Sequence, residues 1–66
     1  MTRRDYVAIA HALSEQVGFV NTENARYVLG CVMQHTADIF AADNPRFDRS
    51  RFMDAAGFWR LQNVTL

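Results

Sequence analysis

Three residues that could bind a metal ion follow one another along the segment 23–43. Cys31, His35 and Asp38 stand at i, i+4 and i+7, a spacing that puts their side chains on one flank of a helix. Zinc accepts a thiolate, an imidazole and a carboxylate, but a closed zinc site needs four ligands. No CxxC, HxxxH or HExxH pair supplies the remainder. We therefore predict no metal site and no cofactor, with Cys31 as a small core residue and His35 as a half-buried packing residue.

The sequence shows no other arrangement typical of catalysis. A Cys31–His35 nucleophile pair would also need an oxyanion site and a substrate cleft, which three short helices seldom provide. The three glycines are far apart, so they form no phosphate-binding loop. The carboxylates are scattered rather than paired, and His11 is expected to face water beside Glu15. We predict that the protein is not an enzyme and has no catalytic residue.

The one local basic cluster lies in the segment 46–51 and consists of Arg46, Arg49 and Arg51. A helix, a turn and a short helix with arginines at its start have the outline of a helix-turn-helix, whose second helix enters the DNA major groove. Asp48 and Asp54 dilute this charge, and seven basic and seven acidic residues cancel over the chain. A small DNA-binding regulator is therefore kept as the alternative hypothesis.

The C-terminal tail, residues 58–66, is strongly apolar for a chain terminus. Large aromatic and aliphatic residues of this kind supply hot spots at protein interfaces, and exposed apolar patches on small proteins mark binding sites. The competing interpretation is that Phe58 and Trp59 close the open end of the core. We predict a partner-binding surface formed by Phe58, Trp59, Leu61, Val64 and Leu66.

These residues must be positioned by helices, because hydrophobic residues recur at helical spacing in three segments. The first helix is expected over about 3–17, with Thr2 as its N-cap. Gly18 suits a left-handed position just past its end, after which Phe19 and Val20 could fold back over the last turn.

A second and longer helix is expected over about 23–43. Thr22 or Asn21 can cap its start, and Pro45 should end it by about Asn44. Gly30 would be explained by a close helix neighbour. The broad apolar stripe predicted to face the core consists of Ala25, Val28, Leu29, Val32, Met33, Thr36, Ile39 and Phe40.

A short third helix is expected over about 49–56, capped by Asp48 and ended by Gly57. Phe52, Met53 and Ala56 should face inward, and Phe47 should anchor the preceding turn under the core. Because the link between the first two helices is short, they should pack as an antiparallel hairpin. The predicted fold is therefore all-α: a helical hairpin plus a short third helix and an apolar tail, in a single domain over 1–66.

Length and composition restrict the class of protein. A chain of 66 residues that is 50% hydrophobic and 12% aromatic is too apolar to be disordered, and its stability should be modest. Its apolar runs fall short of the roughly 20 residues that a membrane span requires. One cysteine and no secretory signal indicate a reducing cytosol.

Two stretches resemble the ends of short uncharacterised proteins encoded by bacteriophages and prophages. Residues 1–10 (MTRRDYVAIA) match an opening of the form T-(K/R)-x-D-Y-x-x-I-A, and residues 43–52 (DNPRFDRSRF) contain N-P-R-F-D-R-x-R-F. The resemblance implies a small helical phage protein in a bacterial host cytoplasm, with no catalytic residues to transfer. The chain departs from the pattern after Gly57, because such proteins are expected to end soon after the third helix.

Together these observations favour a non-enzymatic phage or prophage accessory protein. It is expected to bind another protein, such as a host defence or regulatory factor, or a second copy of itself. The alternative is the DNA-binding regulator that uses Arg46, Arg49 and Arg51.

Overall fold

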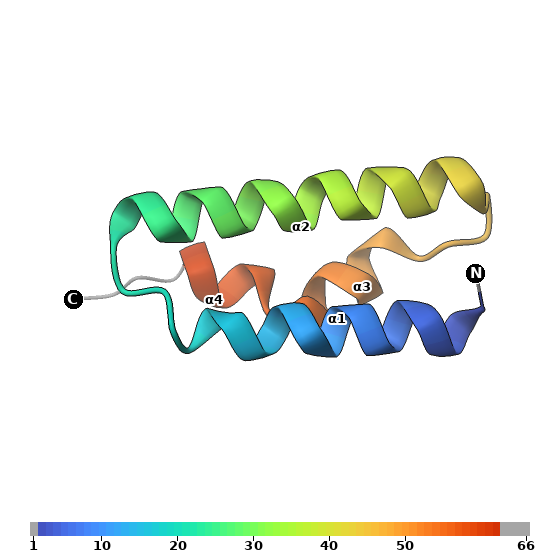
Figure 1. Cartoon of the computed structure of the whole chain (residues 1–66). Helices are drawn as coiled ribbons and strands as arrows, with labels where there is room; N and C mark the ends of the chain where they lie inside the picture. Colours follow the sequence, from blue (N-terminus) through green and yellow to red (C-terminus); the bar gives the residue numbers. More distant parts are fainter. Residues whose placement is uncertain (1, 63–66) are drawn as a thin grey trace.

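The computed structural model describes residues 2–62, which form four helices and, within that range, no strand. The helices are α1 (Arg3–Val17), α2 (Glu23–Asp43), α3 (Arg49–Ala56) and α4 (Phe58–Gln62) (Figure 1). The predicted all-α fold is confirmed, with the first three helices at the predicted bounds. The fourth is new, because the sequence left the conformation of the tail open. No helix in this range is long and apolar enough to cross a membrane.

Side-chain caps fix the beginnings of the three longer helices. The Thr2 hydroxyl accepts from the Asp5 N–H at 3.4 Å, while the Asp5 carboxylate accepts from the Thr2 N–H at 3.0 Å, which completes a capping box. The Thr22 hydroxyl caps α2 at 3.0 Å, and the Asp48 carboxylate caps α3 at 3.1 Å. These contacts confirm the predicted N-caps, with Thr22 rather than Asn21 in front of α2.

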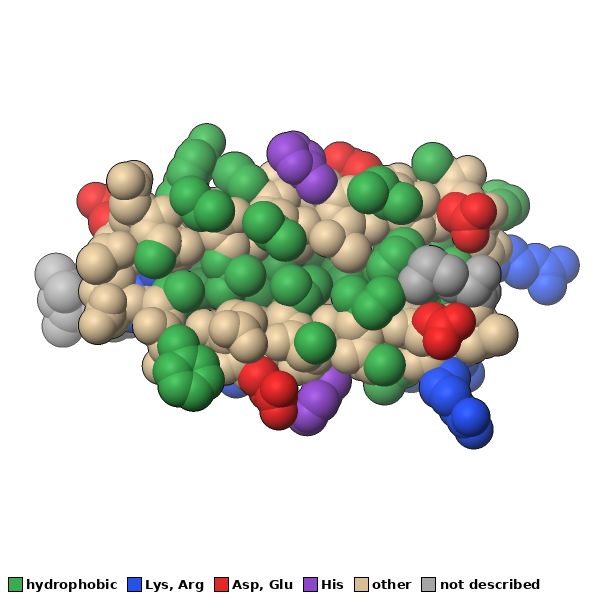
Figure 2. Space-filling view, viewed as in Figure 1, with side chains coloured by type: hydrophobic (Ala, Val, Ile, Leu, Met, Phe, Trp, Pro, Cys, Tyr) green, Lys and Arg blue, Asp and Glu red, His purple; other side chains and the backbone are tan. Residues whose placement is uncertain are grey.

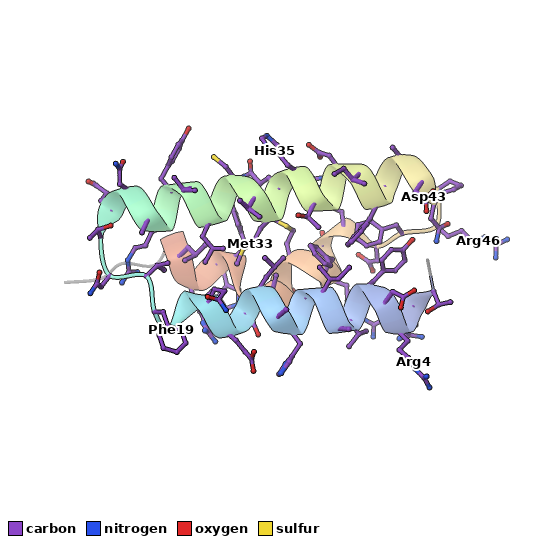
Figure 3. The ribbon with its side chains drawn as sticks, in the orientation of Figure 1. Arg4, Phe19, Met33, His35, Asp43 and Arg46 are labelled. Atoms are coloured by element: carbon purple, nitrogen blue, oxygen red, sulfur yellow. The ribbon has the colours of Figure 1, made fainter. Side chains whose placement is uncertain are left out.

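The ends of the helices agree with the predictions except after α1. Gly57 adopts the left-handed conformation at φ 84°, and α2 ends just before the extended Asn44 that precedes Pro45. Gly18 was predicted to be left-handed but is right-handed, at φ −71°. Phe19 does not fold back over the last turn but points away from the body with 79% of its surface exposed (Figure 3), whereas Val20 packs against the core.

The two long helices run antiparallel, and α3 and α4 follow one another between them in Figure 1. Both short helices contact both long ones, and the principal neighbour of α1 is α3 rather than α2. The predicted hairpin is thus present, but α3 and α4 supply much of the packing that joins its two arms.

The core follows this arrangement and contains an aromatic cluster near the free ends of the hairpin. The rings of Tyr6, Phe40, Phe47 and Phe52 contact one another with centroids 4.8–5.6 Å apart. Phe47 anchors the turn after α2 against the core, as predicted. Met33 lies between the helices at the centre of the molecule (Figure 3). Among the described residues, the buried hydrophobic side chains are those of Ala10, Met33, Ala37, Phe40, Phe52, Ala56 and Leu61.

The predicted orientation of α2 is wrong in part. Met33 and Phe40 are buried as expected, but Val28, Val32 and Ile39 are exposed. Small residues explain the rotation, because Gly30 is buried where α4 packs against α2, and Ala37 is buried in the core as well. The larger aliphatic side chains are consequently turned toward the other side of the helix.

Candidate interaction surface

Exposed apolar side chains gather along one side of α2. Val28, Val32 and Ile39 are 57, 44 and 66% exposed, and their spacing of i, i+4 and i+11 places them in one row. Together with Gln16 at the end of α1 and Val20 in the following linker, they form a surface that we call the open face. It lies on the side of α2 away from α3 and α4.

The open face contains a groove of about 500 Å³ between the end of α1 and the first half of α2. The groove exists because α1 and α2 touch each other at few points and are held apart by the short helices. Its lining is almost entirely apolar. The residues that line it are Gln16, Val20, Asn24, Ala25, Val28, Leu29 and Val32.

Charge is confined to the margins of this surface. Figure 2 shows hydrophobic side chains in a band between the two long helices, with no charged side chain in the visible middle of the band. Asp5 precedes Ile9 by four residues and Asp43 follows Ile39 by four, so each carboxylate lies on the same side of its helix as that apolar residue. Both stand at the end where α1 begins and α2 ends.

The first part of the apolar tail packs on its own molecule. α4 lies against α2 at Gly30, where an added Cβ would stand 3.5 Å from Phe58 Cε1 and 3.9 Å from Leu61 Cδ1. Phe58 is half-buried and Leu61 is only 5% exposed. Two of the residues predicted to contact a partner are therefore core residues, because α4 is a helix whose apolar side faces α2.

The rest of the predicted tail surface divides in two. Trp59 stands on the outer side of α4 with 52% of its surface exposed, so its ring is available to another molecule. Val64 and Leu66 lie outside the described residues. Of the five predicted contact residues, Trp59 is the one that the described structure leaves at the surface.

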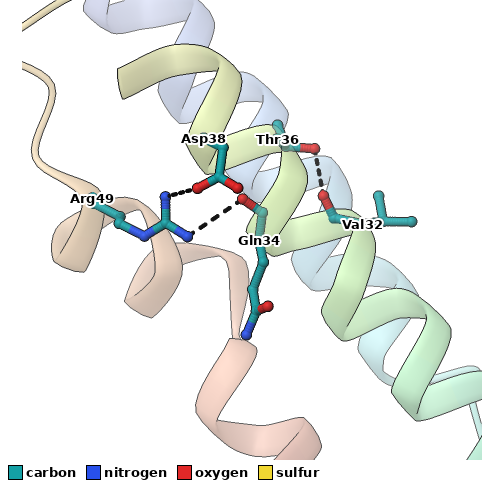
Figure 4. Close-up of polar contacts among 5 residues, drawn as sticks. All are labelled: Val32, Gln34, Thr36, Asp38 and Arg49. Atoms are coloured by element: carbon teal, nitrogen blue, oxygen red, sulfur yellow. Dashed lines mark hydrogen bonds and ion pairs between the residues drawn. The ribbon is translucent and has the colours of Figure 1, made fainter. Parts of the chain in front are cut away.

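The arginine cluster is also divided. The Arg49 guanidinium pairs with the Asp38 carboxylate and donates to the Gln34 carbonyl at 3.4 Å, so it joins α3 to α2 (Figure 4). Arg46 and Arg51 instead line a groove of about 520 Å³ between α1 and α3, which Arg3 also lines. Of the three arginines of the predicted cluster, Arg49 is thus engaged within the molecule, whereas Arg46 and Arg51 share a groove with Arg3.

The residues that could have carried chemistry are not brought together. Asp38 pairs with Arg49, and His35 projects from α2 (Figure 3) in the same row as Val32 and Ile39, where it is exposed rather than half-buried as predicted. Cys31 is a half-buried free thiol. Within residues 2–62, no three His, Cys, Asp or Glu side chains are close enough to hold a metal ion. His11 lies at the surface with its Nε2 3.4 Å from a Glu15 carboxylate oxygen, as predicted.

Comparisons with known proteins identify no relative of this chain. Scans against protein-family models, curated proteins and solved structures return no match.

Proposed function

We propose that this chain is a small, non-enzymatic accessory protein that acts by binding another polypeptide through the open face. The observation that carries this proposal is the row of exposed aliphatic side chains, Val28, Val32 and Ile39, beside an apolar groove. In the proposed function these three residues replace Phe58 and Leu61 as contacts. Trp59 is retained as a separate contact on α4.

Burial of apolar surface supplies the affinity in this proposal. Each Å² of apolar surface removed from water contributes about 25 cal/mol, and side chains already fixed on a helix lose little backbone freedom on binding. The absence of charge from the middle of the band favours a partner that is apolar where it meets this surface.

The phage or prophage origin is part of the proposal and rests on the sequence motifs at residues 1–10 and 43–52. It places the protein in a bacterial host cytoplasm, where a host defence or regulatory factor is a suitable class of partner. A gene located among phage structural or early genes is the expected finding. A gene in a conserved chromosomal operon with no phage neighbours would contradict the origin without affecting the binding proposal.

A binding experiment tests the proposed surface. The wild-type chain, Val32→Glu and Val7→Glu are used as bait with bacterial lysate and, separately, with the purified chain itself. Val7 is the matched control, because this valine is also exposed, at 60%, but lines the grooves on the α3 side and the outer side of α1. We expect binding that survives Val7→Glu and is lost in Val32→Glu. If no polypeptide binds in a manner sensitive to Val32→Glu, the proposed function is wrong.

A second candidate function is nucleic-acid binding, and the groove between α1 and α3 favours it. Arg3, Arg46 and Arg51 line this groove, and among the described residues none of the three takes part in an ion pair. Phosphate groups are recognised by such unpaired guanidinium groups. A mobility shift that weakens steeply with salt and is lost in Arg51→Ala would support this candidate. No shift at low salt would eliminate it.

A further inference from the structure

We propose that the groove between α1 and α3 binds an unpaired nucleotide whose base carries an amino group, either as a free nucleoside phosphate or within a single strand. This inference rests on the second candidate function, because it names the ligand of the same groove, and it does not depend on the open face. Three features of the structure carry it: the arginines that converge on the groove, the other polar groups that line it, and its concave shape.

Three arginines converge on this groove from three different elements. Arg3 comes from the first turn of α1, Arg46 from the turn after α2, and Arg51 from the first turn of α3. All three are exposed, and in the described part of the chain none of them forms an ion pair. Arg4 lines an adjoining groove on the outer side of α1, which shares Arg3 and Val7 with this one. Guanidinium groups gathered in this way bind phosphate oxygens through charge-assisted hydrogen bonds.

The groove is not uniformly basic, because Asp48 also lines it. One carboxylate oxygen of Asp48 accepts from the Arg51 N–H at 3.1 Å, and the described residues provide no donor for the other oxygen. A bare phosphate would be attracted by the arginines and repelled by this carboxylate. A nucleotide avoids that conflict, because its phosphate can contact the arginines while an amino group of its base donates to the carboxylate, as cytosine N4 donates to Asp or Glu.

Two further polar side chains line the groove. The Asn44 side-chain oxygen accepts from the Arg46 N–H at 3.0 Å, so its amide NH₂ group is left as a donor. Tyr6 has a buried hydroxyl without a hydrogen-bond partner among the described residues. Because water does not reach this hydroxyl, the lining side chains must shift slightly before a ligand contacts it. The groove thus offers a donor and a hydroxyl that the described chain does not itself satisfy.

The shape of the surface favours an unpaired nucleotide over a duplex. A helix that enters a DNA major groove has to protrude from its domain. α3 instead contacts both long helices and lies between them in Figure 1, with Phe52 and Ala56 buried and Arg49 engaged in an ion pair.

The groove beside α3 measures about 520 Å³, within the roughly 300–1,000 Å³ of small-ligand sites, and therefore has room for one base and its phosphate. Apart from the polar groups its lining is apolar, which suits the faces of a nucleobase. The apolar lining residues are Val7, Ala10, Phe47, Phe52 and Ala55.

Fluorescence anisotropy with labelled oligonucleotides tests the ligand class. Single-stranded oligo-dC should bind at least about tenfold tighter than oligo-dT, whose base has no amino group, and tighter than a duplex of equal length by a similar factor. The affinity should fall with salt, with a logarithmic slope of about −0.7 for each phosphate contacted. A duplex that binds as tightly as oligo-dC would overturn the inference and leave the second candidate function in place. Equal binding of oligo-dC and oligo-dT would overturn it as well.

Charge-matched variants locate the site. Arg3→Gln and Arg51→Gln should each raise the Kd for oligo-dC at least about fivefold, because each removes a phosphate contact. Arg60→Gln is the control, since Arg60 is exposed but lies on α4 and does not line the groove. It should change the Kd by less than about twofold, and circular dichroism should show equal helix content in all three variants. An equal loss of affinity in Arg60→Gln and Arg51→Gln would indicate non-specific attraction and overturn the site.

Asp48→Asn tests the contact to the base. Asparagine caps a helix as well as aspartate does, so α3 should persist, while the charged acceptor is removed. The preference for oligo-dC over oligo-dT should fall at least about threefold, because hydrogen bonds to a charged acceptor are the stronger ones. An unchanged preference would overturn the role of Asp48 in recognising the base.

Nuclear magnetic resonance of the isotope-labelled chain distinguishes the two sources of the ligand. Cytidine monophosphate should shift the amide signals of Arg3, Arg46 and Arg51 if a free nucleotide is bound, and oligo-dC alone should shift them if the nucleotide belongs to a strand. Shifts with phosphatidylglycerol vesicles and with neither nucleotide probe would overturn the inference in favour of a lipid surface. A chain that binds no nucleotide or nucleic acid overturns both the inference and the second candidate function, whereas Val32→Glu tests polypeptide binding separately.

Discussion

Gly30 lies in the middle of α2, where α4 crosses it. A Cβ at this position would stand 3.5 Å from Phe58 and 3.9 Å from Leu61, which is ordinary van der Waals contact. Glycine inside a helix costs roughly 1 kcal/mol relative to alanine. The close helix neighbour expected from the sequence is therefore present, yet it leaves room for one methyl group.

Gly30→Ala should consequently raise the free energy of unfolding by about 0.5–1 kcal/mol, because it adds helix propensity without a clash. Gly30→Leu should lower it by about 1–3 kcal/mol, because the larger side chain displaces α4. Urea unfolding followed by circular dichroism measures both. A loss of stability in Gly30→Ala would show that α4 approaches α2 more closely than described.

At Gly57 an alanine should be unfavourable instead, because the backbone of Gly57 is left-handed at φ 84°. Gly57→Ala should lower the free energy of unfolding by about 1–2 kcal/mol, since a Cβ is strained in this region. Gly18, at φ −71° and with open space around it, is the matched control, and Gly18→Ala should change stability by less than about 0.5 kcal/mol. Thermal unfolding of Gly57→Ala and Gly18→Ala measures both effects. An equal loss of stability in the two variants would contradict the backbone conformations described for the two glycines.

Single residues differ in how well their conformation can be predicted from the neighbouring sequence. Caps such as Thr2 and Asp48 could be predicted, because the cap and the N–H that it accepts are three residues apart. The conformation of Gly18 could not, because it depends on the path the chain takes afterwards. In the structure the Phe19 N–H donates to the Gln16 carbonyl at 3.0 Å, which continues the right-handed turn.

At the scale of elements, α4 joins the tail to the core. Leu61→Ala should lower the free energy of unfolding by about 2–5 kcal/mol, because Leu61 is 5% exposed and faces α2. Trp59→Ala, two residues earlier and half exposed, should lower the free energy of unfolding far less. Chemical unfolding of both variants distinguishes a core role for the tail from a surface role. Similar losses in the two variants would contradict the described orientation of α4.

The Arg49–Asp38 pair connects α3 to α2 across the molecular surface. Its side chains are 44 and 61% exposed, so solvent screens the pair. Arg49→Ala should therefore lower the free energy of unfolding by no more than about 1 kcal/mol, and the loss should shrink in high salt. A double-mutant cycle with Asp38→Ala isolates the pair. A coupling energy of several kcal/mol would show that the pair is better shielded than this exposure implies.

Sequence periodicity alone could not predict which face of α2 packs against the core. Apolar residues from Val28 to Ala37 span about half of the helix circumference at 100° per residue, and either edge of that arc could have faced inward. The packing of α4 against Gly30 and the burial of Ala37 in the core decided the direction. The open face could not be predicted for this reason. The apolar arc is wider than the face that one helix buries, however, and this width indicated that some of its residues would be exposed.

At the scale of the whole molecule, a small core and an apolar surface occur together. In the described part of the chain, the seven buried hydrophobic side chains include three alanines, so the core of one chain supplies limited stability. If two copies bury the open face, the melting temperature should rise with protein concentration. Differential scanning calorimetry over a dilution series measures this rise. The Val32→Glu variant should melt at a temperature that does not depend on concentration.

The placement of α3 and α4 on the side of α2 away from the open face has a consequence for valency. The groove of the open face and the groove lined by Arg3, Arg46 and Arg51 share no lining residue, so one chain presents both at the same time. If both surfaces bind, a protein of 66 residues would connect two different molecules.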